Sequence, residues 1–137
     1  MSRKIARQVS MKLIFAQLCG GEDTYEAILE KSGINEQPTD ADIEFSRDVL
    51  SGIAKNLQKI DTEISDAAIG WRIDRMPKVD LSILRIAVYE MLYCEDISFS
   101  VSINEAVELA KEFGGEHSPA FINGLLGTVA KKLSRNE

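Results

Sequence analysis

Apolar residues recur every three or four positions along most of this chain, and that spacing is typical of helices with one buried face. Between residues 2 and 19, for example, Ala6, Val9 and Leu13 form one stripe. No stretch alternates apolar and polar residues for long enough to predict a β-strand. The pattern therefore predicts an all-α fold of about seven helices, over residues 2–19, 24–31, 40–57, 61–69, 80–94, 103–113 and 119–134.

Polar residues and glycines mark the expected ends of these helices. Ser102 and Glu105 have the spacing of a capping box, in which each side chain bonds the other residue's backbone N–H. Ser118 stands directly before Pro119, and proline is favoured at the first helical position. Further expected ends are caps at Asp40 and Asp80, a stop at Gly20-Gly21 and a left-handed terminus at Gly114-Gly115.

Length and composition limit the class of protein. At 137 residues the chain fits a single domain, residues 1–137, with one hydrophobic core. It has no apolar run near the roughly 20 residues that cross a bilayer, so we expect no membrane association. The amino terminus begins with charged residues and has no apolar core followed by a small-residue cleavage site, so we expect no secretory signal. Cys19 and Cys94 lie at no metal-ligand spacing, which favours a reducing, cytoplasmic location.

Catalytic and cofactor chemistry is not predicted. His117 is the only histidine, and a lone histidine without a neighbouring cysteine is a poor metal ligand. The chain also lacks a glycine-rich phosphate loop followed by an acidic residue. We therefore expect no enzyme activity, no cofactor and no metal site.

Charge is distributed unevenly along the chain. The net charge is −6, and all 22 acidic residues lie from Glu22 onward. The first 21 residues carry Arg3, Lys4, Arg7 and Lys12 and no acid, a charge of +4. The remainder carries 12 basic and 22 acidic residues, a charge of −10. A basic arm on an acidic body suggests a polyanionic partner.

Several motifs resemble the NusB family of bacterial transcription antitermination factors. Two ungapped segments carry the resemblance most specifically: INEAVELAK at residues 103–111 and FINGLL at residues 121–126. Further matching positions, spread from about Arg3 to Leu133, are Ala6-Arg7, Phe15-Ala16-Gln17, Trp71, Val79-Asp80 and residues 83–90.

The resemblance implies two small packed helical bundles and an adaptor role. A NusB-like protein is expected to bind boxA, a short single-stranded RNA element of nascent ribosomal RNA leaders. It is also expected to form a heterodimer with NusE, a protein of the small ribosomal subunit. That complex is expected to join NusA, NusG and RNA polymerase and to help the polymerase read past terminators.

The same resemblance assigns candidate RNA-binding residues at the amino terminus. Arg3, Lys4 and Arg7 fall in the family's basic segment, with Lys12 beside them. Flexible cationic side chains of this kind neutralise RNA phosphates. Ile5 interrupts the segment, so we expect weak RNA binding without a partner. The residues alone are equally compatible with a solvent-exposed helix face.

Four later residues are candidates for RNA or partner contacts. Phe121 falls where a ring can stack on an RNA base, although helical aromatics also fill cores. Phe15 and Asp80 match family positions that face NusE. The alternative for Phe15 is a position in the core, and the alternative for Asp80 is a helix cap. His117, expected to be exposed before the last helix, is a further candidate for the NusE contact. Arg85 is expected to form a structural ion pair.

Two other interpretations of the chain stay open. A similar helical domain precedes the catalytic part of certain ribosomal RNA cytosine methyltransferases, so the chain is alternatively a relic of such an RNA-binding domain. It is alternatively a protein-interaction scaffold, or a homodimer when free, that covers its own basic surface.

Overall fold

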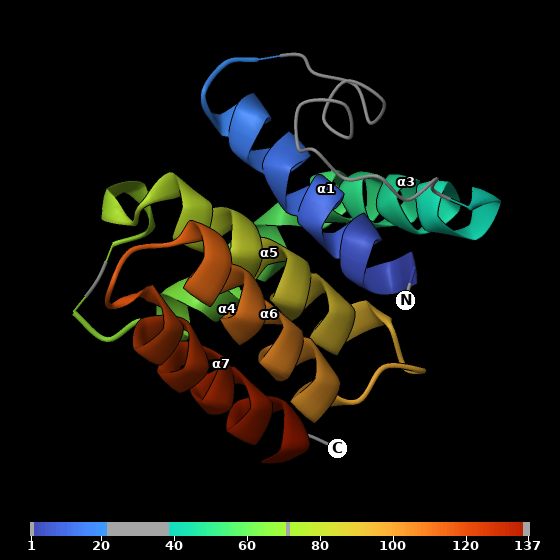
Figure 1. Ribbon diagram of the computed structural model, residues 1–137. Coiled ribbons are helices and arrows are strands. Elements are labelled where there is room, and N and C mark those ends of the chain that lie inside the picture. The colour runs from blue at the N-terminus through green and yellow to red at the C-terminus, as the bar shows by residue number, and fades with distance from the viewer. Residues whose placement is uncertain (1, 22–38, 71, 136–137) are drawn as a thin grey trace.

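The computed structural model describes residues 2–21, 39–70 and 72–135, apart from the side chains of Ser2, Arg3 and Arg135. The helix predicted at 24–31 and the motif residue Trp71 lie outside the described residues. All regular elements in the described ranges are helices, which confirms the predicted all-α class. They are α1 (Ser2–Leu18), α3 (Asp40–Lys55), α4 (Leu57–Ala67), a 3-10 turn (Ile73–Arg75), α5 (Lys78–Tyr93), α6 (Phe99–Phe113) and α7 (Ser118–Arg135) (Figure 1).

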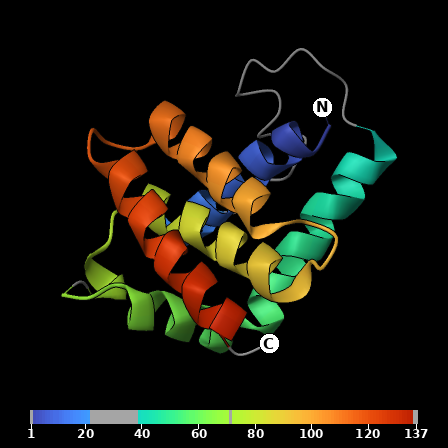
Figure 2. The ribbon, with the colours of Figure 1, turned by 90° about the horizontal axis from the view of Figure 1, so that it is seen from below.

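Helix α5 is the centre of the fold. Ten of its 16 residues are buried, so it has no continuous solvent-facing stripe. Helices α1 and α3 pack on one side of α5, and α4, α6 and α7 pack around the rest (Figure 1, Figure 2). A helix that is apolar on nearly all sides is stable only inside a protein. Helix α5 therefore joins two packed groups of helices, α1 with α3 and α4 with α6 and α7.

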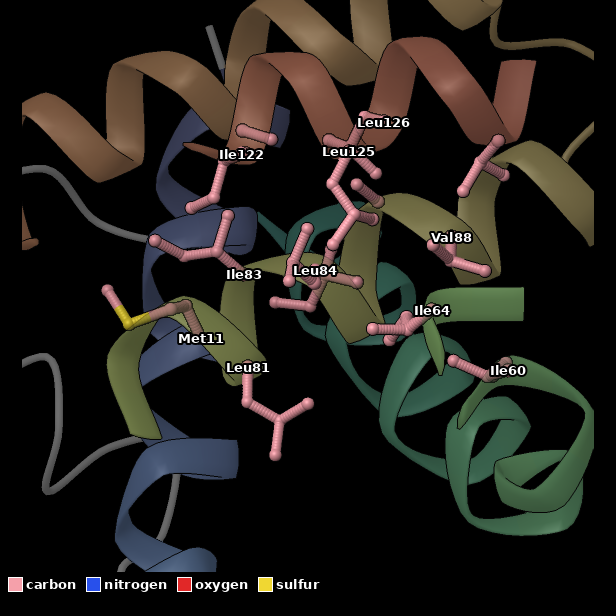
Figure 3. Close-up of a cluster of buried hydrophobic side chains, with 14 of the residues drawn as sticks. Met11, Ile60, Ile64, Leu81, Ile83, Leu84, Val88, Ile122, Leu125 and Leu126 are labelled. Atoms are coloured by element: carbon pink, nitrogen blue, oxygen red, sulfur yellow. The ribbon is translucent and has the colours of Figure 1, made fainter. Parts of the chain in front are cut away.

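The hydrophobic core lies between α5 and the helices around it. Ile83 and Leu84 of α5 are almost fully buried, and Figure 3 shows them beside Ile122 and Leu125 of α7 and Ile64 of α4. Burying a side chain of this size stabilises the folded state by roughly 1.5–3 kcal/mol. These contacts join segments that are far apart in the sequence, so the core fixes the positions of the surrounding helices.

The end of α1 follows the prediction, whereas the cap of α3 does not. Gly20, just after α1, has φ 86, the left-handed conformation that favours glycine at a helix end. The cap of α3 is Thr39 and not Asp40, which corrects the sequence prediction. Thr39 Oγ1 accepts from the Asp42 N–H (3.1 Å), and Asp42 Oδ2 accepts from the Thr39 N–H (2.9 Å). This reciprocal pair is a capping box.

Helix α6 begins one turn earlier than predicted. It starts at Phe99 after Ser98, whose Oγ accepts a hydrogen bond from the Val101 N–H (3.3 Å). The predicted capping box of Ser102 and Glu105 is therefore wrong, because both residues lie inside the helix. The Ser102 hydroxyl is thus available for a contact with another helix.

The junction of α5 and α7 also differs from the prediction. Helix α5 begins at Lys78, so Asp80 stands in its first turn and not at its cap. Asp80 Oδ1 accepts a hydrogen bond from Ser118 Oγ (2.7 Å), and Ser118 Oγ accepts from the Gly115 N–H (2.9 Å). Gly114 has φ −90, so the left-handed terminus predicted there is wrong. A Cβ at Gly114 would lie 2.7 Å from Ser118 Cβ, so glycine allows this close approach.

Candidate interaction surfaces beside the first helix

An ion pair is buried between α1 and α5. Arg7 donates from Nε to Glu90 Oε2 (2.8 Å) and from Nη2 to Glu90 Oε1 (2.9 Å). Arg7 is 6% exposed and Glu90 is 1% exposed. Two parallel N–H···O bonds fix both the distance and the relative orientation of the two groups. The pair therefore determines how α1 lies on α5.

Two further helices contact this ion pair. Ser102 of α6 donates from Oγ to Glu90 Oε1 (2.9 Å), and Glu105 Oε1 of α6 lies 3.7 Å from Arg7 Nη1. On the α3 side, the guanidinium carbon of Arg7 lies 5.8 Å from the centre of the Phe45 ring. We call Arg7, Glu90, Ser102 and Glu105 the Arg7 brace. The brace connects α1 to both α5 and α6.

The brace corrects the expected placement of Arg7. The family resemblance assigns Arg7 to the RNA-binding residues together with Arg3 and Lys4, but its guanidinium is buried and bonded to Glu90. The signal for this arrangement is Glu90, a carboxylate within the apolar segment 80–94, because a buried carboxylate requires a cationic partner. Arg7 therefore lacks the exposure that a phosphate contact requires. Lys4 is exposed, and the Arg3 side chain lies outside the described residues.

One groove, of about 520 Å³, opens between the start of α1 and the start of α6. We call it the amino-end groove. Lys4 contributes an exposed ammonium group to it, whereas Asp96 and Glu105 contribute carboxylates, so the groove carries charges of both signs. Its lining residues are Lys4, Arg7, Asp96, Ile97, Ser98, Val101 and Glu105.

A second groove, of about 510 Å³, lies between the other end of α1, the start of α5 and the end of α6. We call it the carboxyl-end groove. Phe15 is 36% exposed at this groove. Lys12 Nζ lies 4.7 Å from the centre of the Phe113 ring, a cation–π contact between α1 and α6. The lining residues are Met11, Lys12, Phe15, Ala16, Cys19, Gly21, Val79 and Phe113.

A third, smaller groove of about 270 Å³ brings together three residues that the sequence singled out. Asp80, His117 and Phe121 all line this Asp80 groove. Asp80 is buried, and this burial raises the pKa of its carboxyl group, while the hydrogen bond from Ser118 opposes that rise. His117 is exposed, and Phe121 is half-buried and packs partly against the core.

The carboxyl-end groove and the Asp80 groove lie next to each other. Val79 lines the first and the following residue, Asp80, lines the second. Phe113 likewise lines the carboxyl-end groove, and Gly115, two residues later, lines the Asp80 groove. The three predicted partner-facing residues, Phe15, Asp80 and His117, are therefore placed along one face around the first turn of α5. Lys12, predicted to bind RNA, lies on this face as well.

A second bidentate ion pair joins α5 to α4, as predicted for Arg85. Arg85 donates from Nε to Asp61 Oδ1 (3.0 Å) and from Nη2 to Asp61 Oδ2 (2.9 Å). Neither residue lines the three grooves described above. This pair is thus a natural comparison for the Arg7 brace, because it has the same chemistry on a different helix pair.

The chemistry of these surfaces is that of binding sites. Among the described residues, no group of three His, Cys, Asp or Glu side chains is arranged to hold a metal ion. None of the helices in the described ranges is long and apolar enough to cross a membrane. The three grooves combine apolar walls with a few charged groups, an arrangement suited to recognising a partner molecule.

Comparison with known sequences points to one family. The sequence model of the NusB family matches residues 2–131. The transcription antitermination protein NusB of Acetivibrio thermocellus is 46% identical over 134 residues, covering 96% of this chain and 90% of the relative. The protein of the same description from Carboxydothermus hydrogenoformans is 43% identical over 137 residues, covering 97% of this chain and 95% of the relative.

Solved structures share the fold. T. maritima NusB is 37% identical and superposes with a TM-score of 0.82, over 96% of this chain and 92% of that one. A chain in a complex of the antitermination factors NusB and NusE with dsRNA superposes with a TM-score of 0.79 at 23% identity. That match covers 96% of this chain and 97% of the other, and it shows likeness of fold alone.

Proposed function

This chain belongs to the NusB family, and we propose that it is a transcription antitermination factor that binds boxA RNA of ribosomal RNA leaders together with NusE. In this proposal it joins the elongating RNA polymerase complex with NusA and NusG. It catalyses no reaction. It acts as an adaptor, presenting one surface to RNA and another to a protein.

The observation that carries the proposal is the exposed ring of Phe15 over an apolar groove. Phe15, with Val79 and Phe113, offers the kind of aromatic and aliphatic surface that forms the centre of protein interfaces. The neighbouring Asp80 groove adds the exposed imidazole of His117, a polar group of the kind that gives an interface its orientation, whereas the Asp80 carboxylate is buried in its wall and bonded to Ser118. We assign this face to NusE, and Lys12 belongs to it.

The RNA surface is assigned to the start of α1. Lys4 is exposed there, and Arg3 stands in the same first turn. The amino end of a helix carries a partial positive charge that also favours phosphate. Arg7 is removed from the set of RNA contacts because it is buried in the brace. Phe121, half-buried at the edge of the NusE face, stays in the proposal as the candidate for base stacking.

A transcription assay tests the proposed function. Purified RNA polymerase, NusA, NusG and NusE transcribe a template with boxA upstream of a terminator, with and without this protein. The proposal predicts more read-through when the protein is present, and only on the template with an intact boxA. Equal read-through with intact and scrambled boxA would contradict it. Light scattering of the free protein and of its mixture with NusE tests the homodimer interpretation: a dimer that NusE does not dissociate favours the scaffold.

A further inference from the structure

We infer that the Arg7 brace couples RNA binding to NusE binding, with Arg7 as a positioning residue and not an RNA contact. The inference rests on the proposed function, because it assumes that RNA and NusE are the two ligands. It assigns a role to the brace residues Arg7, Glu90, Ser102 and Glu105. Arg7 and Glu105 also line the amino-end groove, but the Arg7 guanidinium is bonded to Glu90.

The two larger grooves lie along one seam of the molecule. Helix α5 packs against both α1 and α6 (Figure 1), and side chains of α1 and α6 line each of the two grooves. The amino-end groove, with Lys4, opens at one end of this seam, and the carboxyl-end groove, with Phe15, opens at the other. Lys4 and Phe15 are 11 residues apart on α1, or roughly 16 Å at the rise of an α-helix. The brace crosses the seam at Arg7, between these two residues.

Helix α1 transmits a shift at one groove to the other. It is one continuous helix from Ser2 to Leu18, so a rotation or translation that reshapes the carboxyl-end groove also moves Lys4. Apolar contacts between helices tolerate small slides, whereas a bidentate guanidinium–carboxylate pair loses its geometry when either group moves. The hydrogen bond from Ser102 to Glu90 extends this constraint to α6. The brace thus holds α1 in one setting relative to both neighbouring helices.

RNA binding and NusE binding are coupled if both ligands bind best to the position of α1 that the brace fixes. NusE, bound over Phe15, favours the position of α1 in which the brace is intact, and RNA bound at Lys4 then finds its cationic group already in place. Linkage requires RNA to favour NusE by the same factor. Stability alone is a weak reason to keep such a pair, because apolar residues of similar volume often replace a buried ion pair without loss of stability. A role in positioning α1 gives the charged brace a function that apolar packing lacks.

The test removes the brace while preserving the core. The triple variant Arg7→Met, Glu90→Leu, Ser102→Ala replaces the pair by apolar groups and leaves no buried hydroxyl without its acceptor. The matched control is the double variant Arg85→Met, Asp61→Leu, which removes the other bidentate pair of α5. For each protein, fluorescence anisotropy gives the Kd for labelled boxA RNA with and without saturating NusE. Titration of labelled NusE without RNA gives the Kd for NusE alone.

The expected result is a loss of coupling without a loss of affinity for NusE alone. The affinity of one coupled site typically changes by about 5–150-fold when the ligand of the other site is bound. We expect this ratio to fall at least fivefold toward unity in the triple variant and to keep the wild-type value in the control. The Kd of the triple variant for NusE alone should stay within about twofold of wild type, which corresponds to less than about 0.5 kcal/mol.

Three results would overturn the inference. A triple variant with the wild-type ratio would show that coupling arises from direct contact between RNA and NusE. A triple variant with both separate affinities weakened and the ratio unchanged would show a purely structural role for the brace. A wild-type protein that binds neither boxA nor NusE would overturn the proposed function itself, which separates that failure from the first two.

Discussion

The ring of Tyr89 in α5 lies directly against Gly52 in α3. A Cβ placed at Gly52 would come within 2.2 Å of Tyr89 Cε1, closer than real carbon atoms approach. Glycine at this position therefore allows α3 and α5 to pack at the distance that the Tyr89 ring requires. The ring also packs beside Tyr93, one turn later on α5, with 5.5 Å between the ring centres. This contact helps to hold α3 on the central helix.

The Gly52 contact predicts opposite effects for two glycine-to-alanine changes. Gly52→Ala should destabilise the fold by about 1–3 kcal/mol, because the ring or the helices must move to admit the methyl group. Gly124→Ala is the matched control: a Cβ there meets no atom within 4 Å, and alanine favours the helical state by up to about 1 kcal/mol over glycine. Urea unfolding followed by circular dichroism measures both. A Gly52→Ala protein as stable as wild type would contradict the tight contact.

Removing one partner of the buried ion pair should destabilise the fold far more than removing one partner of an exposed ion pair. Glu90→Gln leaves the buried Arg7 guanidinium with only the Glu105 carboxylate, 3.7 Å from Nη1, as a counter-charge, at a cost of up to roughly 3–5 kcal/mol. The control is Lys111→Gln, because Lys111 pairs with Glu108 on an exposed surface and such pairs contribute at most about 1 kcal/mol. Urea midpoints compare the two variants. Similar losses in both would mean that Glu90 carries no buried charge pair.

The raised pKa of Asp80 predicts a pH dependence of stability. Burial moves this pKa above its ordinary value of 3.8, so the folded protein keeps the proton at pH values where the unfolded chain has lost it. Asp80 therefore reduces the free energy of unfolding as pH rises from below 3.8 through the folded pKa.

Asp80→Asn does not ionise and still accepts a hydrogen bond from Ser118. Its stability relative to wild type should thus increase as pH rises toward neutral, which unfolding curves at a series of pH values can measure. A stability difference that does not vary with pH, or that shrinks as pH rises, would contradict this assignment.

The proposed NusE face predicts a selective effect at Phe15. Phe15→Ala should weaken NusE binding by about tenfold or more, since truncating a central interface aromatic commonly costs over 1–2 kcal/mol. Binding of boxA RNA alone should be unchanged. Tyr93→Ala is the control, because Tyr93 is a comparably exposed aromatic at the far end of α5. Calorimetric titration with NusE separates them, and equal affinities for the two variants would remove Phe15 from the interface.

Much of the architecture follows from apolar periodicity, because a helix that packs on a core must repeat its apolar residues every three or four positions. The start of α6 does not follow in this way. Ser98 and Ser102 both have capping chemistry, and only the packing of Ser102 against Glu90 decides between them. Local sequence gives no information about that contact, since Glu90 and Ser102 lie on different helices.

The candidate site was predicted less completely than the fold. Arg7 belongs to a basic segment, and its position in the helical repeat is one that an exposed cation can also occupy. Its burial depends on Glu90, 83 residues away, so periodicity around Arg7 does not show it. An acidic residue in an apolar helix is the sequence signal that points to a buried pair. By contrast, Phe15, Asp80 and His117 were placed on a common face by family resemblance, and their role in binding NusE stays a prediction.

The most direct test of coupled RNA and NusE binding is the affinity of the wild-type protein for boxA RNA with and without NusE. Anisotropy titrations use labelled boxA and a scrambled RNA of the same length, with Lys4→Glu as the variant of the RNA surface. The account predicts weak boxA binding by the protein alone, at least about fivefold tighter binding with NusE present, and a preference for boxA over the scrambled RNA. Lys4→Glu should weaken boxA binding in both conditions. Equal boxA affinity with and without NusE would contradict the account of two coupled surfaces.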